Sequence, residues 1–206
     1  MLSIDRLEHV MESVMFVRDG ASGRFATTFE ALERLANEQG LAIAVVGGMA
    51  AIHYGYATTT EDVDILLAAG QVDAFLQAAP SYGFAVRRRS PRGWHILEHS
   101  SGVELDVVPE GGMPRDDAPV PVPSPLQVGV SKGLAYASLE GWVEIKLGSN
   151  RLKDRSHVVE VLKTLQMPAI EQVKRHLQSV HPVLTQRFEE LAGIAANERQ
   201  RPDESV

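Results

Sequence analysis

Residues 41–67 read LAIAVVGGMAAIHYGYATTTEDVDILL, two short apolar runs separated by a pair of glycines and a polar turn. The first run, residues 41–46, is brief and ends at Gly47-Gly48, which is typical of a buried strand. The second run, residues 62–67, follows the polar turn and also has the composition of a strand. Between them, residues 49–54 are predicted to form a short helix. A strand that runs into paired glycines brings their backbone to the edge of a sheet.

The second run carries two acids. Side chains two residues apart on a strand point to the same side, so Asp62 and Asp64 project together while Val63 and Ile65 enter the core. Two adjacent carboxylates repel each other unless solvent or a cation compensates them, and hard oxygen ligands of this kind suit Mg²⁺ or Mn²⁺. This strand is therefore a candidate metal site.

A third acid lies on another predicted strand, residues 103–108. If this strand pairs beside the first, about 5 Å away, Asp106 and its same-face neighbour Glu104 join the two acids. Nucleotidyl transfer needs such a group, because divalent ions bridge a triphosphate and neutralise the charge that develops. The glycine pair Gly47-Gly48 supplies the complement, since backbone amides without a β-carbon can cradle a phosphate.

The rest of the chain divides at a loop. Helices are predicted over residues 27–38 and 72–79 and strands over residues 84–88 and 94–98. Residues 110–125 hold two glycines and five prolines, a composition that resists helix and strand alike. Beyond them the pattern becomes helical, over residues 139–147 and 156–165 and after Pro168 and Pro182.

This order predicts an α/β (α+β) fold with a mixed β-sheet flanked by helices. We expect an α/β core with N-terminal helices over residues 1–125, followed by a helical C-terminal region over residues 126–198. Residues 199–206 are predicted to form a disordered tail.

The bulk composition excludes several classes of protein. With no cysteine, the chain has no disulfide, thiolate zinc site or cysteine nucleophile. It contains no apolar run of about 18 residues, so we expect a cytoplasmic protein that does not span a membrane. A formal net charge of -7 argues against broad, sequence-independent binding of nucleic acid. Neither G-x-S-x-G nor G-x-x-x-x-G-K is present, so nothing supports a serine hydrolase or a P-loop.

One basic run departs from the acidic balance. Arg87, Arg88 and Arg89 are followed closely by Arg92 and Trp94, the one place where positive charge and an aromatic ring come together. The favoured interpretation is a solvated strand end, because charge runs are usually solvated surface. A contact with nucleic acid is the alternative.

The glycine pair and the acids together resemble a known family. The stretch from Val46 through Gly47-Gly48 and Thr60 to Asp64 is similar to the signature of the nucleotidyltransferase superfamily, in particular of small bacterial nucleotidyltransferases that include the toxins of abortive-infection toxin-antitoxin systems. The similarity spans about residues 42–165.

The resemblance implies a role for residues further along the chain. Asp106 matches the third carboxylate of the family, and Lys146 matches a lysine that faces the nucleotide phosphates. From spacing alone, Lys146 is instead the solvent-facing member of its helix. Asp154 is predicted to cap the next helix.

The resemblance also implies an activity. It predicts an enzyme that moves an NMP from an NTP to a hydroxyl of RNA (tRNA included) or of a protein, as the toxin of a toxin-antitoxin pair with an antitoxin partner. Asp62, Asp64 and Asp106 would bind Mg²⁺ or Mn²⁺, and Asp106 would also assist the acceptor hydroxyl. The triphosphate would be held by Gly47-Gly48 and Lys146.

Two positions depart from the family pattern. Met49 stands where relatives commonly carry serine or threonine, and Thr58 stands where many carry arginine. These departures leave an alternative open, a non-catalytic module of the same fold that binds a nucleotide or a partner.

Overall fold

The computed structural model describes residues 21–90 and 93–200. In chain order, its helices and strands are α2 (Ala21–Glu38), β1 (Ala42–Val45), α3 (Gly47–His53), β2 (Asp62–Leu67), α4 (Val72–Ala78), β3 (Phe84–Arg89), β4 (His95–His99), β5 (Glu104–Pro109), β6 (Gly133–Tyr136), α5 (Leu139–Ser149), α6 (Leu152–Thr164), α7 (Met167–Val180) and α8 (Pro182–Arg199). Two short 3₁₀ turns, Ala69–Gln71 and Ala79–Tyr82, flank α4.

The strands form one mixed sheet in the order β3-β4-β5-β2-β1-β6. β2 runs parallel to β5, and β1 runs parallel to β6. The other neighbours, β1 with β2, β3 with β4 and β4 with β5, are antiparallel. The predicted fold class, a mixed sheet flanked by helices and followed by a helical C-terminal region, is confirmed.

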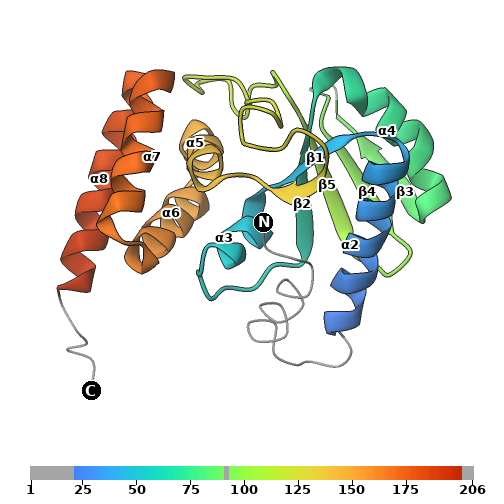
Figure 1. Cartoon of the computed structure of the whole chain (residues 1–206), viewed down its shortest axis with the longest axis horizontal. Helices are drawn as coiled ribbons and strands as arrows, with labels where there is room; N and C mark the ends of the chain where they lie inside the picture. Colours follow the sequence, from blue (N-terminus) through green and yellow to red (C-terminus); the bar gives the residue numbers. More distant parts are fainter. Residues whose placement is uncertain (1–20, 91–92, 201–206) are drawn as a thin grey trace.

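Helices cover both faces of the sheet, with α2 and α4 on one side and α5 to α8 on the other (Figure 1). On the first face, the side chains of alternate strand residues pack against α2 and α4; they include Ile43, Val45, Ile65, Leu105 and Val107, in contact with a core that holds Leu32, Leu35 and Phe75. On the second face, the intervening residues pack against the C-terminal helices; they include Ala44, Leu66 and Val108, in a core with Trp142, Leu147, Val158, Leu162 and Phe188. Since each fully buried side chain of this size contributes about 1.5–3 kcal/mol, the two cores fix which side of each strand faces which helices.

The boundary predicted at residue 125 misses one strand. Residues 126–198 were expected to be helical, but β6 pairs with β1 at the edge of the sheet, so part of this segment belongs to the core. β6 has only four residues, begins at a glycine with φ +66° and is partly exposed. Such a short edge strand carries no alternating pattern from which it could be predicted.

The ends of the chain were also predicted. An N-terminal helix was expected over residues 27–38, and α2 covers it and begins earlier, at Ala21; residues 1–20 lie outside the described residues. The tail predicted to be disordered begins too early, because Arg199 is the last residue of α8 and donates to the Lys163 carbonyl oxygen; residues 201–206 lie outside the described residues. Among the helices that the structure describes, none is long and apolar enough to cross a membrane.

Candidate active site

The predicted acids lie on two adjacent strands. The parallel register of β2 and β5 sets Asp64 opposite Asp106 and Asp62 opposite Glu104, which confirms the predicted pairing of these strands. Since side chains alternate between the faces of a sheet, all four carboxylates point to the face that α5 and α6 cover further along. We call these four residues the acid group. Three of them are half-buried, and only Glu104 is exposed.

The glycine pair packs directly on the acid group. Gly47 has φ +62°, and a β-carbon there would lie 1.7 Å from Asp64 Oδ2. A β-carbon on Gly48 would lie 2.8 Å from Thr60 Oγ1. The Gly48 backbone amide also favours the charged form of Asp64. The absence of a β-carbon therefore lets Gly47 approach Asp64 and lets Gly48 approach Thr60.

Two further contacts hold this turn in place. Thr60 Oγ1 donates to Asp62 Oδ1 at 2.5 Å, which orients the first acid. The buried indole of Trp142 on α5 donates from Nε1 to the Gly47 carbonyl oxygen at 3.0 Å. Sequence reasoning missed Trp142, because nothing in a helical pattern tells which backbone carbonyl a buried indole will reach.

The electrostatics of the acid group oppose ionisation. Burial raises the pKa of Asp64, and the charge of Asp62 adds to the rise, while Lys146 and the Gly48 hydrogen bond oppose it. Burial likewise raises the pKa of Asp106 to about 6, with further contributions from Asp64, Asp62 and Glu104 and an opposing one from Arg88. A carboxyl among other carboxyls resists losing its proton unless a cation compensates the charge.

The acid group fits a divalent cation that is shared with a substrate. Asp106 Oδ1 is buried and accepts no hydrogen bond from any of the described residues. This oxygen is therefore free to coordinate a cation. Across residues 21–90 and 93–200, no three acidic or histidine side chains are arranged to hold an ion by themselves. This combination suits Mg²⁺, which proteins usually bind through one or two carboxylates and the phosphates of a substrate.

Lys146 lies behind the acid group. Its side chain is 7% exposed, and Nζ donates to Asp154 Oδ1 at 3.0 Å. Arg151 donates to the same carboxylate from Nε at 2.7 Å and from its backbone N–H at 3.3 Å. Burial alone would raise the pKa of Asp154, but the Arg151 hydrogen bonds and the Lys146 charge outweigh it and lower this pKa to about 2.

These contacts decide two predictions. Asp154 is the third residue of α6 and accepts from the backbone N–H of Arg151, the residue that precedes the helix. It therefore satisfies a backbone donor at the start of the helix, but from inside the first turn and not from the turn between the helices, as was predicted, because α6 begins at Leu152. The solvent-facing alternative for Lys146 is wrong, since the side chain is buried beside Asp154. Its charge also acts on Asp64.

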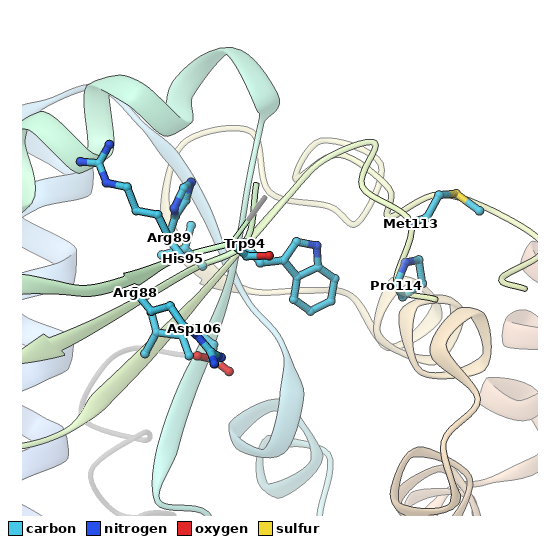
Figure 2. Close-up of a pocket in the computed structure, with 10 residues that line it drawn as sticks. Arg88, Arg89, Trp94, His95, Asp106, Met113 and Pro114 are labelled. Carbon is cyan, nitrogen blue, oxygen red and sulfur yellow. The ribbon is translucent and has the colours of Figure 1, made fainter. Parts of the chain in front are cut away.

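Two clefts open beside the acid group. The larger, about 750 Å³, is polar and lies on the side of Asp62; its lining residues are Arg24, Thr59, Thr60, Glu61, Asp62, Gly102, Glu104 and Lys153. The smaller, about 410 Å³, lies on the side of Asp106 and includes Arg88, Trp94, Ile96, Met113 and Pro114 (Figure 2). Arg24, on α2, has no sequence signal that would link it to the acids, because it lies about forty residues before them.

The structure places both residues that depart from the family pattern. Met49 is fully buried in the core with Ile43 and Ile65, so its side chain does not face the acid group. Thr58 is half-buried.

His53, at the end of α3, has a packing role. It stacks on Tyr136, with ring centroids 4.1 Å apart.

Comparisons with known proteins give weak likenesses. No family model and no curated protein matches the chain. The solution structure of the antibiotic-resistance factor ANT(2'')-Ia matches 85% of this chain and 94% of its own, at 14% identity and a TM-score of 0.45. An apo CCA-adding enzyme matches 88% of this chain but 49% of its own, at 14% identity and a TM-score of 0.44. Terminal uridylyl transferase 4 from Trypanosoma brucei matches 79% and 56%, at 11% identity and a TM-score of 0.38. Likeness at this level does not assign an activity to the chain.

Proposed function

We propose that the chain is a metal-dependent nucleotidyltransferase that moves an NMP from an NTP to an acceptor hydroxyl. One observation carries the proposal: Asp64 and Asp106 are register partners on parallel strands, with Asp62 on the same face and Asp106 Oδ1 buried without a donor. Carboxylates arranged in this way need a cation, and an NTP brings the phosphates that complete its coordination.

The acids have separate roles in the proposed reaction. Asp62 and Asp64, with Asp106, hold Mg²⁺ or Mn²⁺, which when bound neutralises charge on the triphosphate. Asp106 takes the proton of the acceptor hydroxyl. The hydroxyl oxygen then forms a bond to the α-phosphorus, the bond from that phosphorus to the β-phosphate oxygen breaks, and pyrophosphate leaves.

The larger cleft is the proposed triphosphate site. It brings the cations Arg24 and Lys153 and the Thr59 hydroxyl together with three acids, Glu61, Asp62 and Glu104. The cations and the hydroxyl suit phosphate oxygens, and the acids require that a divalent cation enter with the triphosphate. Lys146 is proposed to act from behind, as a fixed positive charge that Asp154 holds beside Asp64.

The glycine pair is proposed to act on nucleotide binding indirectly, by positioning the acids. Gly47 lets the backbone approach Asp64, and the Gly48 amide favours the charged form of this carboxylate. The two glycines are the first residues of α3, so the start of this helix would lie beside the bound phosphates.

Transfer from labelled nucleotide tests this activity. Wild-type protein is incubated with Mg²⁺ and each α-labelled NTP together with RNA and protein acceptors, and pyrophosphate is measured in parallel. We expect label transfer that is lost in Asp62→Asn/Asp64→Asn and kept in Asp73→Asn, which removes an exposed acid on α4. Equal transfer by the double variant and the wild type would overturn the proposal.

The biological setting is also a proposal. The motif resembles that of abortive-infection toxins, which motivates a toxin that modifies RNA or a protein and is neutralised by an antitoxin partner. Expression of the wild-type chain should then slow growth, and Asp64→Ala should not. Equal growth of the two cultures would remove the toxin role and leave the transferase activity to its own test.

A further inference from the structure

The smaller cleft is built by the register of the sheet. Arg88 on β3 pairs with Ile96 on β4, Ile96 pairs with Asp106 on β5, and Asp106 pairs with Asp64 on β2. Residues directly opposite each other across a sheet point to the same face. A single row therefore runs from the arginine to the acids. In Figure 2, Arg88 and Asp106 point to the same side of the sheet, whereas Arg89 points to the other side.

The arginine in this row is available to a ligand. Its neighbour Arg87 is paired with Glu98 at 3.0 Å. Arg88 is exposed and makes no ion pair with any acid that the structure describes. A guanidinium presents a planar fork of donors that matches the oxygens of a phosphate. One end of the cleft is thus suited to an anion, although the chain as a whole is acidic.

An aromatic ring forms the wall between the arginine and the loop that follows β5. Trp94 lies just before β4 and extends toward the loop that carries Met113 and Pro114 (Figure 2). Its Nε1 is buried and has no hydrogen-bond partner among the described residues. The buried edge of the ring lies near Gly112, where a β-carbon would be 3.3 Å from Nε1. An indole face beside apolar side chains is a surface on which a planar base can stack.

We propose that this cleft is the acceptor site and that it takes the terminal nucleotide of a polyribonucleotide. This inference rests on the proposed transferase function and narrows its acceptor. The terminal phosphodiester binds Arg88, the base stacks on Trp94, and the terminal 3'-hydroxyl lies beside Asp106, which accepts its proton as its oxygen bonds to the α-phosphorus. A serine, threonine or tyrosine hydroxyl of a protein brings neither a phosphate nor a base, so it would leave both groups unused.

Kinetics with an oligoribonucleotide acceptor test the assignment. Arg88→Gln is compared with Arg87→Gln, which removes the same charge from the same strand but from a side chain outside the cleft. We expect Arg88→Gln to raise the KM for the oligonucleotide about tenfold, the cost of a charged hydrogen bond. The KM for the NTP should stay within about twofold, because the triphosphate lies in the other cleft.

A second pair of variants tests the stacking. Trp94→Ala should raise the KM for the oligonucleotide about tenfold, and Trp94→Phe, which keeps an aromatic face, should restore most of it. Thermal melting of both variants checks that they are folded. Equal KM values for Arg88→Gln and Arg87→Gln, or faster transfer to a hydroxyl peptide than to the oligonucleotide, would overturn the acceptor assignment.

A binding measurement separates this inference from the proposed activity. Fluorescence anisotropy follows a labelled oligonucleotide with a 3'-deoxy end as it binds the wild-type protein without NTP. Weaker binding to Arg88→Gln than to Arg87→Gln supports the site even if no transfer is detected, in which case only the transferase proposal fails. Equal binding to the two variants refutes the site whatever the transfer assay shows.

Discussion

Asp106 is expected to make the metal-free protein less stable at neutral pH than an uncharged side chain in its place. Its pKa rises from 3.8 to about 6 in the folded chain, first through burial and then through Asp64, Asp62 and Glu104. The folded state therefore binds this proton more tightly than the unfolded state. The free energy of unfolding falls as pH rises from 3.8 to about 6, and the full penalty applies above that range. At about 1.36 kcal/mol per pH unit, this penalty is at most about 3 kcal/mol.

The substitution Asp106→Asn removes the charge and keeps the shape. In urea unfolding followed by circular dichroism in EDTA, the variant should gain up to about 3 kcal/mol over the wild type at about pH 8 and almost nothing at about pH 4. Asp73→Asn, on the exposed side of α4, is the control for loss of one acid. The reasoning is refuted if Asp106→Asn is destabilising at the higher pH, or if its gain does not change with pH.

Two further predictions concern the elements that support the acids. Gly47→Ala should lower the free energy of unfolding by about 1–3 kcal/mol through its backbone conformation alone. It should also abolish transfer, because the new β-carbon would lie 1.7 Å from Asp64 Oδ2. The control Gly70→Ala, whose β-carbon meets nothing within 4 Å, should change neither thermal melting nor transfer, and equal effects of the two variants would contradict this account. Asp154→Asn should cost about 3–5 kcal/mol in urea unfolding, because it leaves the buried Lys146 without its counter-charge. A cost below about 1 kcal/mol, the value of an exposed pair, would show that this ion pair is solvated.

The local part of the site could be predicted from the sequence, and the long-range part could not. Strand alternation alone places Asp62 and Asp64 on one face, and β2 has the predicted bounds. The position of Asp106 beside them depends on two strands about forty residues apart in the chain, which periodicity does not encode. The family resemblance supplied that step.

The contacts of the glycine pair show the same limit. A Gly-Gly before a helix predicts a close approach of backbone to something, but not that the neighbour is Asp64. The indole that fixes the turn comes from Trp142, 95 residues further along the chain. Such contacts arise only when the C-terminal helices pack on the sheet, so they follow from tertiary structure and not from local pattern.

The acceptor cleft could be predicted only in part: its residues are visible in the sequence, but their arrangement is not. The basic run and Trp94 are visible in the sequence, where a solvated strand end is the simpler interpretation. The register separates the members of the run, because Arg87 pairs with Glu98 while Arg88 joins the row that leads to Asp106. A bulge between Val86 and Arg88 interrupts the alternation of β3, and Glu98, the partner of Arg87, lies on the same face as the acids. The two arginines therefore differ in their partners and not in their face of the sheet, and no composition argument predicts this.

The central claim is that the acid group binds a divalent cation together with an NTP. A crystal structure of the wild-type chain with Mn²⁺ and a non-hydrolysable NTP tests it most directly, because the anomalous signal of manganese locates the ion independently of the nucleotide. We expect a manganese peak in contact with at least two of the carboxylates of Asp62, Asp64 and Asp106, with the triphosphate in the cleft that Lys153 and Thr60 line. A nucleotide bound elsewhere, or a manganese peak away from these three carboxylates, would contradict the account.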